Sequence, residues 1–339
     1  MGNNDSNDLD QALEDPMPGR RQHAILNRRG RCWVLLLVTA LVFLANAVVP
    51  PHLMDDVDAV QAQIARNMLQ SGDWVTPRLD GVPYLEKSPM IYWMMAVSFR
   101  VFGVHDWAAR LPLCLSCMLL CWTLYRFGCW AIDEKTGFYT GVTLATSTGL
   151  YLFTRILIPD AIVTLTISIA IWSGLRLLDD DAINPQRWSA VLGAAVGTGL
   201  LLKGLIAALF PVLTLLLFML LSREAFRSES WRRLHLPMVI GACIVVAAPW
   251  HILATLRNPP YFDFSLKSAP GQYHGFFWFY FINEHLLRFL NLRYPRDYNT
   301  VPESGSGFSI WSGCSRGRSI SPVPSSLNTT QRQEQVERT

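Results

Sequence analysis

The chain has 339 residues, of which 51% are hydrophobic and only 16% are charged, whereas charged residues make up about 25% of an average soluble domain. This composition excludes an ordinary soluble protein and predicts an integral membrane protein. The net charge of +3 is too small to indicate a nucleic-acid partner, and we expect none.

The N-terminal segment 1–30 is polar, first acidic and then basic, and we expect a disordered cytoplasmic tail there. Arg28, Arg29 and Arg31 precede the mostly apolar run 33–50. A basic flank on such a run predicts a spanning helix whose N-terminus is cytoplasmic. A cleaved signal peptide is the alternative, but the run is longer than an ordinary signal core, and no small-residue cleavage site ends it.

Further apolar runs predict a polytopic protein, because each is long enough, or nearly so, to cross a hydrocarbon core of about 30 Å. They lie at 111–130, 137–157, 160–178, 188–202, 204–221 and 237–256. The run 89–103 is shorter, and if it spanned, the arginine-rich loop 222–235 would lie outside. Basic loops are typical of the cytoplasmic side, so we take 89–103 as a juxtamembrane helix. About seven spans then remain, with 51–110 and the chain after residue 257 outside.

The same topology puts Asp160 and Lys203 on the outer side, together with the loop 51–110. Ionisable residues at the mouths of apolar spans are costly to keep there. Each is therefore either a functional group or the mark of a helix end, and both alternatives stay open.

Within the outer loop, Val57, Val60, Ile64 and Met68 recur at helical spacing, and Gly72 marks a helix end. We expect this helix to lie on the membrane with the apolar stripe facing down.

Three carboxylates, Asp55, Asp56 and Asp58, stand at the start of that helix, where the helix dipole stabilises negative charge. They either cap the helix or carry the chemistry. They could also hold a divalent metal ion, although nothing requires one, and we expect no required cofactor.

A tight-turn signal, Asp80-Gly81, leads to Lys87, Ser88 and Pro89. We expect Ser88 to cap the next helix and Pro89 to occupy its first position. Lys87 then precedes a helix start whose free amides favour anions, which predicts a phosphate site. The alternative is a lysine that snorkels to lipid headgroups.

The aromatic segment 276–290 predicts an interfacial amphipathic helix. Its polar part comprises Asn283, Glu284, His285 and Arg288. From residue 301 the composition turns polar, and we expect 301–339 to be disordered. Cys114, Cys117 and Cys121 repeat at helical spacing without any accompanying His or carboxylate, so we expect apolar packing there and no metal site.

Several segments occur in the order seen in a known family. They are the acidic start Asp55-Asp56 followed by IARNML, SGDWVTPRLDGVPYLEK at 71–87, WAARLP at 107–112, RILIPDA at 155–161, LLLKG at 200–204 and FINEHLLRFL at 281–290. With these motifs the chain resembles the polyprenyl-phosphate-sugar-dependent membrane glycosyltransferases. The likeness is strongest to the aminoarabinose transferases that modify lipid A, which are related to the protein O-mannosyltransferases.

The resemblance implies an all-α polytopic membrane protein of the glycosyltransferase C-type, in which 31–300 form a helical bundle with extracytoplasmic juxtamembrane helices. It implies inverting transfer of a sugar from a polyprenyl-phosphate donor. The acceptor would be a lipid A-like lipid, a glycan or a protein, on the extracytoplasmic face of the bacterial inner membrane.

The resemblance also implies roles for single residues. Asp55 or Asp56 looks like the catalytic carboxylate, Asp160 like a second acid, and Lys87 like the contact to the donor phosphate. The family shows Asp-Glu followed by Arg-Tyr where this chain has Asp-Asp-Val-Asp, so the choice among the first three aspartates stays open. The remaining substrate-binding candidates are Tyr84, Glu86, Arg78, Arg155, Lys203, Glu284 and His285.

Family members continue beyond the FINEH segment with further spans and an extracytoplasmic domain, whereas this chain turns polar near residue 303. We therefore expect a truncated or frameshifted product. Two alternatives to an active transferase stay open, a membrane transporter and an inactive remnant. A transporter would place charged residues deep in several spans, whereas here they gather at one face.

Overall fold

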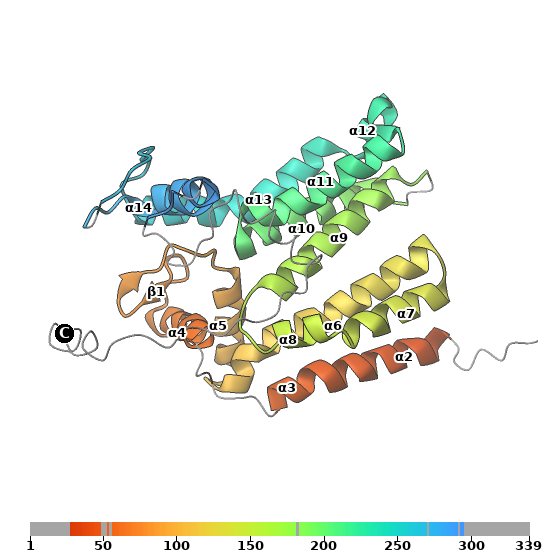
Figure 1. The fold of residues 1–339 in the computed structure, drawn as a ribbon, viewed down its shortest axis with the longest axis horizontal. Helices are drawn as coiled ribbons and strands as arrows, with labels where there is room; N and C mark the ends of the chain where they lie inside the picture. Colours follow the sequence, from red (N-terminus) through yellow and green to blue (C-terminus); the bar gives the residue numbers. More distant parts are fainter. Residues whose placement is uncertain are drawn as a thin grey trace, which may run out of the picture.

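The computed structural model describes residues 28–48, 53, 56–180, 183–269, 271–290 and 292–294. Their regular secondary structure is almost entirely helical, with a single small hairpin, so the predicted all-α class is confirmed. The predicted tail 301–339 and most of the tail 1–30 lie outside the described residues. Figure 1 shows the long helices running roughly alongside one another, with α4, α5 and the hairpin together at one end.

Most of the elements follow one another with short connections. The first part comprises α2 (Arg28–Thr39), the π-helical turn η1 (Ala40–Leu44), α3 (Ala45–Val48), α4 (Asp56–Ser71), β1 (Arg78–Leu79), β2 (Val82–Pro83), α5 (Met90–Phe102), α6 (Asp106–Ala131), α7 (Glu134–Ala145) and α8 (Thr148–Phe153). The second part comprises α9 (Asp160–Leu178), α10 (Pro185–Lys203), α11 (Leu205–Leu221), η2 (Glu224–Phe226), α12 (Ser228–Arg233), α13 (Leu236–Arg257), α14 (Gly275–Phe277) and the π-helix η3 (Trp278–Leu287).

The centre of the bundle is α10, which packs against both α9 and α13. Two glycines one turn apart, Gly193 and Gly197, let α10 and α13 approach closely. A Cβ atom on Gly193 would lie 2.2 Å from the carbonyl oxygen of Val239, and one on Gly197 would lie 2.9 Å from that of Cys243. Close backbone contact between these two helices therefore depends on glycine, which has no side chain, at both positions.

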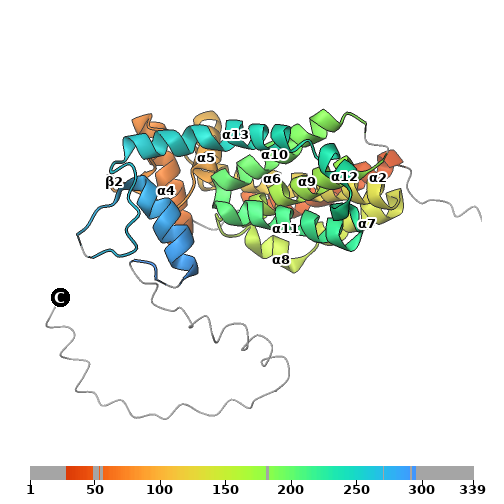
Figure 2. The same cartoon turned by 90° about the horizontal axis from the view of Figure 1, so that it is seen from above.

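Three helices in the described part of the chain are long and apolar enough to cross a bilayer, namely Asp106–Ala131, Asp160–Leu178 and the stretch Ser228–Arg257. Met90–Phe102 and Leu205–Leu221 are apolar but shorter. The count of about seven spans stays a prediction. In Figure 2, α4 and the helix of residues 275–287 lie across the end of the bundle, where juxtamembrane helices were expected.

The apolar run 137–157 was predicted as one span, but the structure divides it into α7 and α8. The break falls at Thr146 and Ser147, two hydroxyl residues that compete with the backbone for hydrogen bonds. Thr146 Oγ1 donates to the Val142 carbonyl at 2.9 Å, and Ser147 Oγ accepts a bond from the Leu150 N–H at 3.4 Å. α7 therefore ends at this point, and the side chain of Ser147 caps the start of α8.

The predicted helix of the outer loop is confirmed as α4, which ends where Gly72 takes a φ of +70°. The expected direction of its apolar stripe was wrong. Ile64 is 0% exposed and Met68 is 1% exposed, and both belong to the main core with residues of α5 and α6. Protein therefore covers the C-terminal half of the stripe, whereas Val57, in its N-terminal half, is 42% exposed.

A buried ion pair joins α4 to the bundle. Arg110 Nη2 of α6 donates to Asp58 Oδ2 at 3.1 Å, and both side chains are almost completely buried. The other carboxylate oxygen, Oδ1, accepts the backbone N–H of Leu157 at 2.7 Å. Asp58 therefore ties together α4, α6 and the segment that leads into α9, which gives it a structural role.

Replacing Asp58 with Ala is expected to lower the free energy of unfolding by about 3–5 kcal/mol, because Arg110 would keep a buried charge without its carboxylate. Unfolding of the purified chain in detergent measures the effect. Asp180→Ala is the control, because Asp180 is 88% exposed and pairs with Arg233 at the surface. Equal losses of stability in the two variants would contradict the role given to Asp58.

Candidate active site

A short hairpin carries the chain from α4 towards Lys87. Its strands pair antiparallel around Asp80-Gly81, as the turn signal predicted. Asp80 has a φ of +49° and Gly81 a φ of +81°, a conformation that suits these two residue types. The hairpin delivers Tyr84, Glu86 and Lys87 to the end of the bundle.

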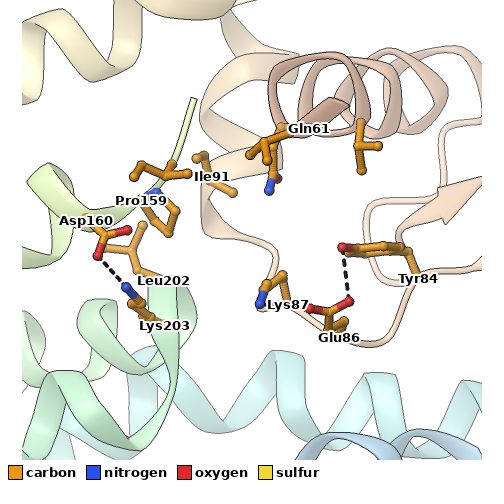
Figure 3. Close-up of a pocket in the computed structure, with 12 residues that line it drawn as sticks. Gln61, Tyr84, Glu86, Lys87, Ile91, Pro159, Asp160, Leu202 and Lys203 are labelled. Carbon is orange, nitrogen blue, oxygen red and sulfur yellow. Dashed lines mark hydrogen bonds and ion pairs between the residues drawn. The ribbon is translucent and has the colours of Figure 1, made fainter. Parts of the chain in front are cut away.

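A cavity of about 450 Å³ lies where this segment meets α4, α9 and α10. Figure 3 shows Lys87 between two groups, the Asp160–Lys203 pair on one side and Glu86 with Tyr84 on the other. The remaining lining residues are Val57, Val60, Gln61, Ile91, Ile158, Pro159 and Leu202. The structure thus brings together, from segments far apart in the chain, five of the predicted site residues.

The charge of Lys87 is balanced locally, because its Nζ lies 2.9 Å from Glu86 Oε1. Burial favours a higher pKa for Glu86, but the positive charges of Lys87 and Arg293 outweigh it and hold that pKa below the usual value. The Tyr84 hydroxyl donates to Glu86 Oε2 at 3.3 Å. Burial and the Glu86 carboxylate raise the pKa of Tyr84 to about 12, so Tyr84 remains a neutral donor.

The second lysine is also paired. Lys203, the last residue of α10, forms an ion pair with Asp160, the first residue of α9. The sequence left open whether Asp160 caps its helix, and no side-chain cap is found at this helix start, where Pro159 is the N-cap residue. The two groups are each more than one-third exposed, so they face the cavity and remain accessible.

A larger cavity of about 1010 Å³ adjoins the first and shares Glu86, Lys87, Leu202 and Lys203 with it. One wall is apolar and belongs to α11. The α11 residues are Leu205, Ile206, Ala208, Leu209 and Val212. A second part of the lining comes from η3 and the two residues after it, namely Tyr280, Glu284, His285, Arg288 and Phe289. A charged chamber therefore opens into a groove with an apolar side.

Glu284 is held by two arginines, because its carboxylate lies 2.6 Å from Arg293 Nε and 3.0 Å from Arg288 Nη1. Burial raises the pKa of Glu284, although Arg293 opposes the shift. Arg293 Nη2 is also 3.6 Å from Glu86 Oε1 and so connects the two carboxylates. Sequence reasoning missed Arg293, which follows the helix in a segment without periodicity.

His285 is fixed by main-chain contacts. Its Nδ1 lies 2.6 Å from the carbonyl oxygen of Tyr280, and its Nε2 accepts the N–H of Leu205 at 3.4 Å. Gly204, with a φ of +72°, allows the close approach between α10, α11 and this ring. The expected amphipathic helix is therefore a wall of the site, with Asn283 and Glu284 buried against protein.

We expected Ser88 to cap α5, but it does not. Its hydroxyl donates to the Leu200 carbonyl at 3.1 Å and shares a hydrogen bond of 2.5 Å with the Tyr280 hydroxyl. Pro89 is the N-cap residue, and the helix begins at Met90 without a side-chain cap. Ser88 is buried, so long-range partners replace the local one. Tyr280 was missed because nothing in the sequence separates it from neighbouring aromatic residues.

Two predicted substrate-binding residues lie outside the linings of both cavities. Arg78 Nη1 donates to the Gly81 carbonyl at 3.2 Å and stabilises the hairpin turn. Arg155 donates to the Tyr151 hydroxyl and lies 4.8 Å over that ring. Asp55 and the side chain of Asp56 lie outside the described residues, so their catalytic role stays a prediction.

Within the described residues, no three His, Cys, Asp or Glu side chains gather as a metal site would require. The thiols of Cys114, Cys117 and Cys121 are free and buried, as expected for apolar packing. Two lysines beside an apolar groove suit an amphiphilic anion, because ammonium groups bind phosphate and the groove covers hydrocarbon.

The family described as "Dolichyl-phosphate-mannose-protein mannosyltransferase" matches residues 86–252. The undecaprenyl phosphate-alpha-4-amino-4-deoxy-L-arabinose arabinosyl transferase of Aeromonas hydrophila is 29% identical over 237 residues, which cover 67% of this chain and 39% of that protein. The enzyme of the same name from Pseudomonas aeruginosa is 29% identical over 277 residues, which cover 78% of this chain and 45% of that protein.

The fold is also similar to a solved structure, that of ArnT from Cupriavidus metallidurans bound to undecaprenyl phosphate. The TM-score is 0.65 at 27% identity, and the match covers 84% of this chain and 49% of that one. The resemblance inferred from the sequence motifs is thereby confirmed, and so is the helical membrane fold. The chain spans less than half the length of the relatives it matches.

Gly204→Ala is expected to destabilise the chain more than Gly72→Ala does. Both glycines have a left-handed φ, which costs other residues about 1–2 kcal/mol. A Cβ on Gly204 would also lie 2.2 Å from His285 Nε2, whereas one on Gly72 meets nothing within 4 Å. Overpacking adds about 1–3 kcal/mol. Thermal unfolding in detergent compares the variants, and equal shifts in Tm would show that His285 is not tightly held.

Proposed function

We propose that this chain, a relative of the polyprenyl-phosphate-sugar-dependent glycosyltransferases of the aminoarabinose transferase type, transfers a sugar from a polyprenyl-phosphate donor to an acceptor oxygen. One observation carries the proposal: a charged cavity and a groove with an apolar wall share Lys87 and Lys203. The donor is divided in the same way, into a phosphate-linked sugar and a hydrocarbon chain.

The donor phosphate would bind between Lys87 and Lys203, where both cavities meet. Its polyprenyl chain would run along α11, on which Leu205, Leu209 and Val212 are about half exposed. Covering these side chains with hydrocarbon is favourable, at about 25 cal/mol for each Å² of apolar surface buried. The sugar would then occupy the smaller cavity, near Tyr84 and Asp160.

In the proposed reaction, the acceptor oxygen attacks the anomeric carbon from the side opposite the phosphate, which inverts the configuration. The bond between that carbon and the phosphate oxygen breaks, and polyprenyl phosphate leaves as an anion. Lys87 and Lys203 stabilise the negative charge that develops on the phosphate. If the acceptor is a hydroxyl, its proton passes to Asp55 or Asp56, and if the acceptor is itself a phosphate, the aspartate only positions it.

Asp160 has a different role in this proposal. It holds Lys203 in place at the C-terminal end of α10, since the two groups form an ion pair. Asp160 is therefore a positioning residue for the lysine, and the proton acceptor comes from the start of α4.

The proposed site of action is the extracytoplasmic face of a bacterial inner membrane, with the N-terminus in the cytoplasm. The arginines in the first turn of α2 and those of the loop 222–235 support this orientation, because basic residues favour the cytoplasmic side. The proposed acceptor is a lipid A-like glycolipid, with a glycan or a protein as the alternatives.

The test measures transfer of a radiolabelled sugar from polyprenyl-phosphate donors in membranes that carry this chain. Lys87→Ala is expected to lower transfer roughly 100-fold, because one group that stabilises the leaving phosphate is lost. Of Asp55→Asn and Asp56→Asn, the variant that removes the base is expected to lower transfer roughly 100-fold or more. Binding of polyprenyl phosphate, measured in the same membranes, is expected to weaken in Lys87→Ala and to persist in both aspartate variants.

Lys267→Ala is the matched control, since Lys267 is an exposed lysine that lines neither cavity. Its transfer rate is expected to equal that of the wild type. Full activity in all three site variants would remove the proposed site, and an equal loss in the control would point to an effect of overall charge.

The proposed mechanism needs no metal ion, because the two lysines supply the positive charge that the leaving phosphate requires. Transfer is therefore expected to be unchanged after treatment with EDTA. A loss of transfer that Mg²⁺ or Mn²⁺ restores would contradict this and would make a divalent metal part of the mechanism.

A further inference from the structure

A second charged cavity, of about 380 Å³, lies at the opposite end of the bundle from Lys87 and Lys203. Five helices build it with their end turns, as can be followed in Figure 1: α2, α7 and α10 begin there, and α6 and α9 end there. Helix starts carry partial positive charge and helix ends partial negative charge, so three starts and two ends leave a small excess of positive charge. The charged side chains make the larger contribution to the charge of the cavity.

The charged side chains that line this cavity are mostly basic, namely Arg28, Arg126 and Arg176. Glu134 is the one carboxylate among the described lining residues, and its Oε2 lies 3.8 Å from Arg31 Nη1. The lining therefore has an excess of positive charge, which favours an anion.

Two buried N–H groups of the lining have no hydrogen-bond partner among the described residues, Trp172 Nε1 and Arg176 Nε. They lie one turn apart on α9 and so share a face of the helix. Buried donors are almost always paired in folded proteins, because an unpaired one loses its bond to water. Both groups need an acceptor, and a ligand that carries oxygens would provide it.

Arg176 is held in position by its surroundings. Its guanidinium lies 5.1 Å over the ring of Trp130 and 5.3 Å over that of Trp188, and Nη1 is 3.7 Å from Asp179 Oδ2. A guanidinium fixed by stacking loses little conformational freedom when it binds an anion. This geometry is preorganised for an oxyanion.

Trp130, Trp172 and Trp188 all line the cavity, and the rings of Trp172 and Trp188 are 5.6 Å apart. Tryptophan gathers at the depth of lipid headgroups, since its ring is apolar and its N–H is polar. The position at the ends of five helices agrees with that depth. A ligand here would reach the cavity from the bilayer surface.

We propose that this cavity binds the phosphate group of an anionic phospholipid, from the leaflet opposite the candidate active site. Arginines between helices at a membrane surface are suited to such headgroups, because each guanidinium can form paired hydrogen bonds with phosphate oxygens. The lipid phosphate supplies acceptors to Arg176 and Trp172, while its acyl chains stay in the bilayer. This site is independent of the proposed sugar transfer.

The test uses the full chain, purified in detergent and stripped of lipid. Native mass spectrometry measures binding of phosphatidylglycerol, phosphatidylcholine and inorganic phosphate. Phosphatidylglycerol is expected to bind at least about tenfold more tightly than the other two and to raise Tm. Arg176→Gln and Arg126→Gln are each expected to weaken its binding roughly tenfold, because a charged hydrogen-bond donor is lost.

Arg126 is exposed, so Arg126→Gln keeps the test valid even if the substitution of Arg176 disturbs packing. Arg232→Gln is the control, because Arg232 is an exposed arginine of α12 that does not line the cavity. Wild-type affinity in Arg126→Gln and Arg176→Gln, or equal weakening in the control, would overturn the proposal. Inorganic phosphate that binds as tightly as the lipid would also overturn it and would indicate a site for a soluble anion.

Discussion

The structure of the candidate active site depends on the carboxylate of Asp58. One oxygen binds Arg110, which is 52 residues away in the chain, and the other binds the N–H of Leu157, which is 99 residues away. A buried ion pair adds little net stability, since both charges lose their hydration. Its contribution here is geometric. It fixes the first turn of α4 relative to the segment that leads to Asp160.

The parts of the site that the sequence predicted are those governed by local or topological rules. The end of α4 at Gly72 follows from backbone geometry, and the turn at Asp80-Gly81 does too. The meeting of Asp160 and Lys203 with the outer loop was expected because basic loops constrain which side of the membrane a segment occupies. Neither argument requires knowledge of which side chains touch.

What the sequence could not provide is the identity of long-range partners. Asp58 is one of three aspartates within four residues, and its buried partner Arg110 lies 52 residues away, where no local rule points. Ser88 carries a local capping signal, yet it bonds to Leu200 and Tyr280, which are 112 and 192 residues away. The apolar stripe of α4 has the same period whether lipid or protein covers it. Periodicity and capping rules describe one segment at a time, so they do not choose between such partners.

Binding of an anion at the candidate active site is an exchange of partners, because both lysines already hold carboxylates. Glu86 is 2.9 Å from Lys87, and Asp160 is paired with Lys203. A carboxylate left buried without a partner would make this exchange costly. Glu86 avoids that outcome through Arg293, 3.6 Å away, and Asp160 avoids it through its exposure of 36%. Lys87 and Lys203 can therefore leave their carboxylates to bind a donor phosphate, and they can pair with them again when the product phosphate leaves. The charged network is thus compatible with repeated turnover.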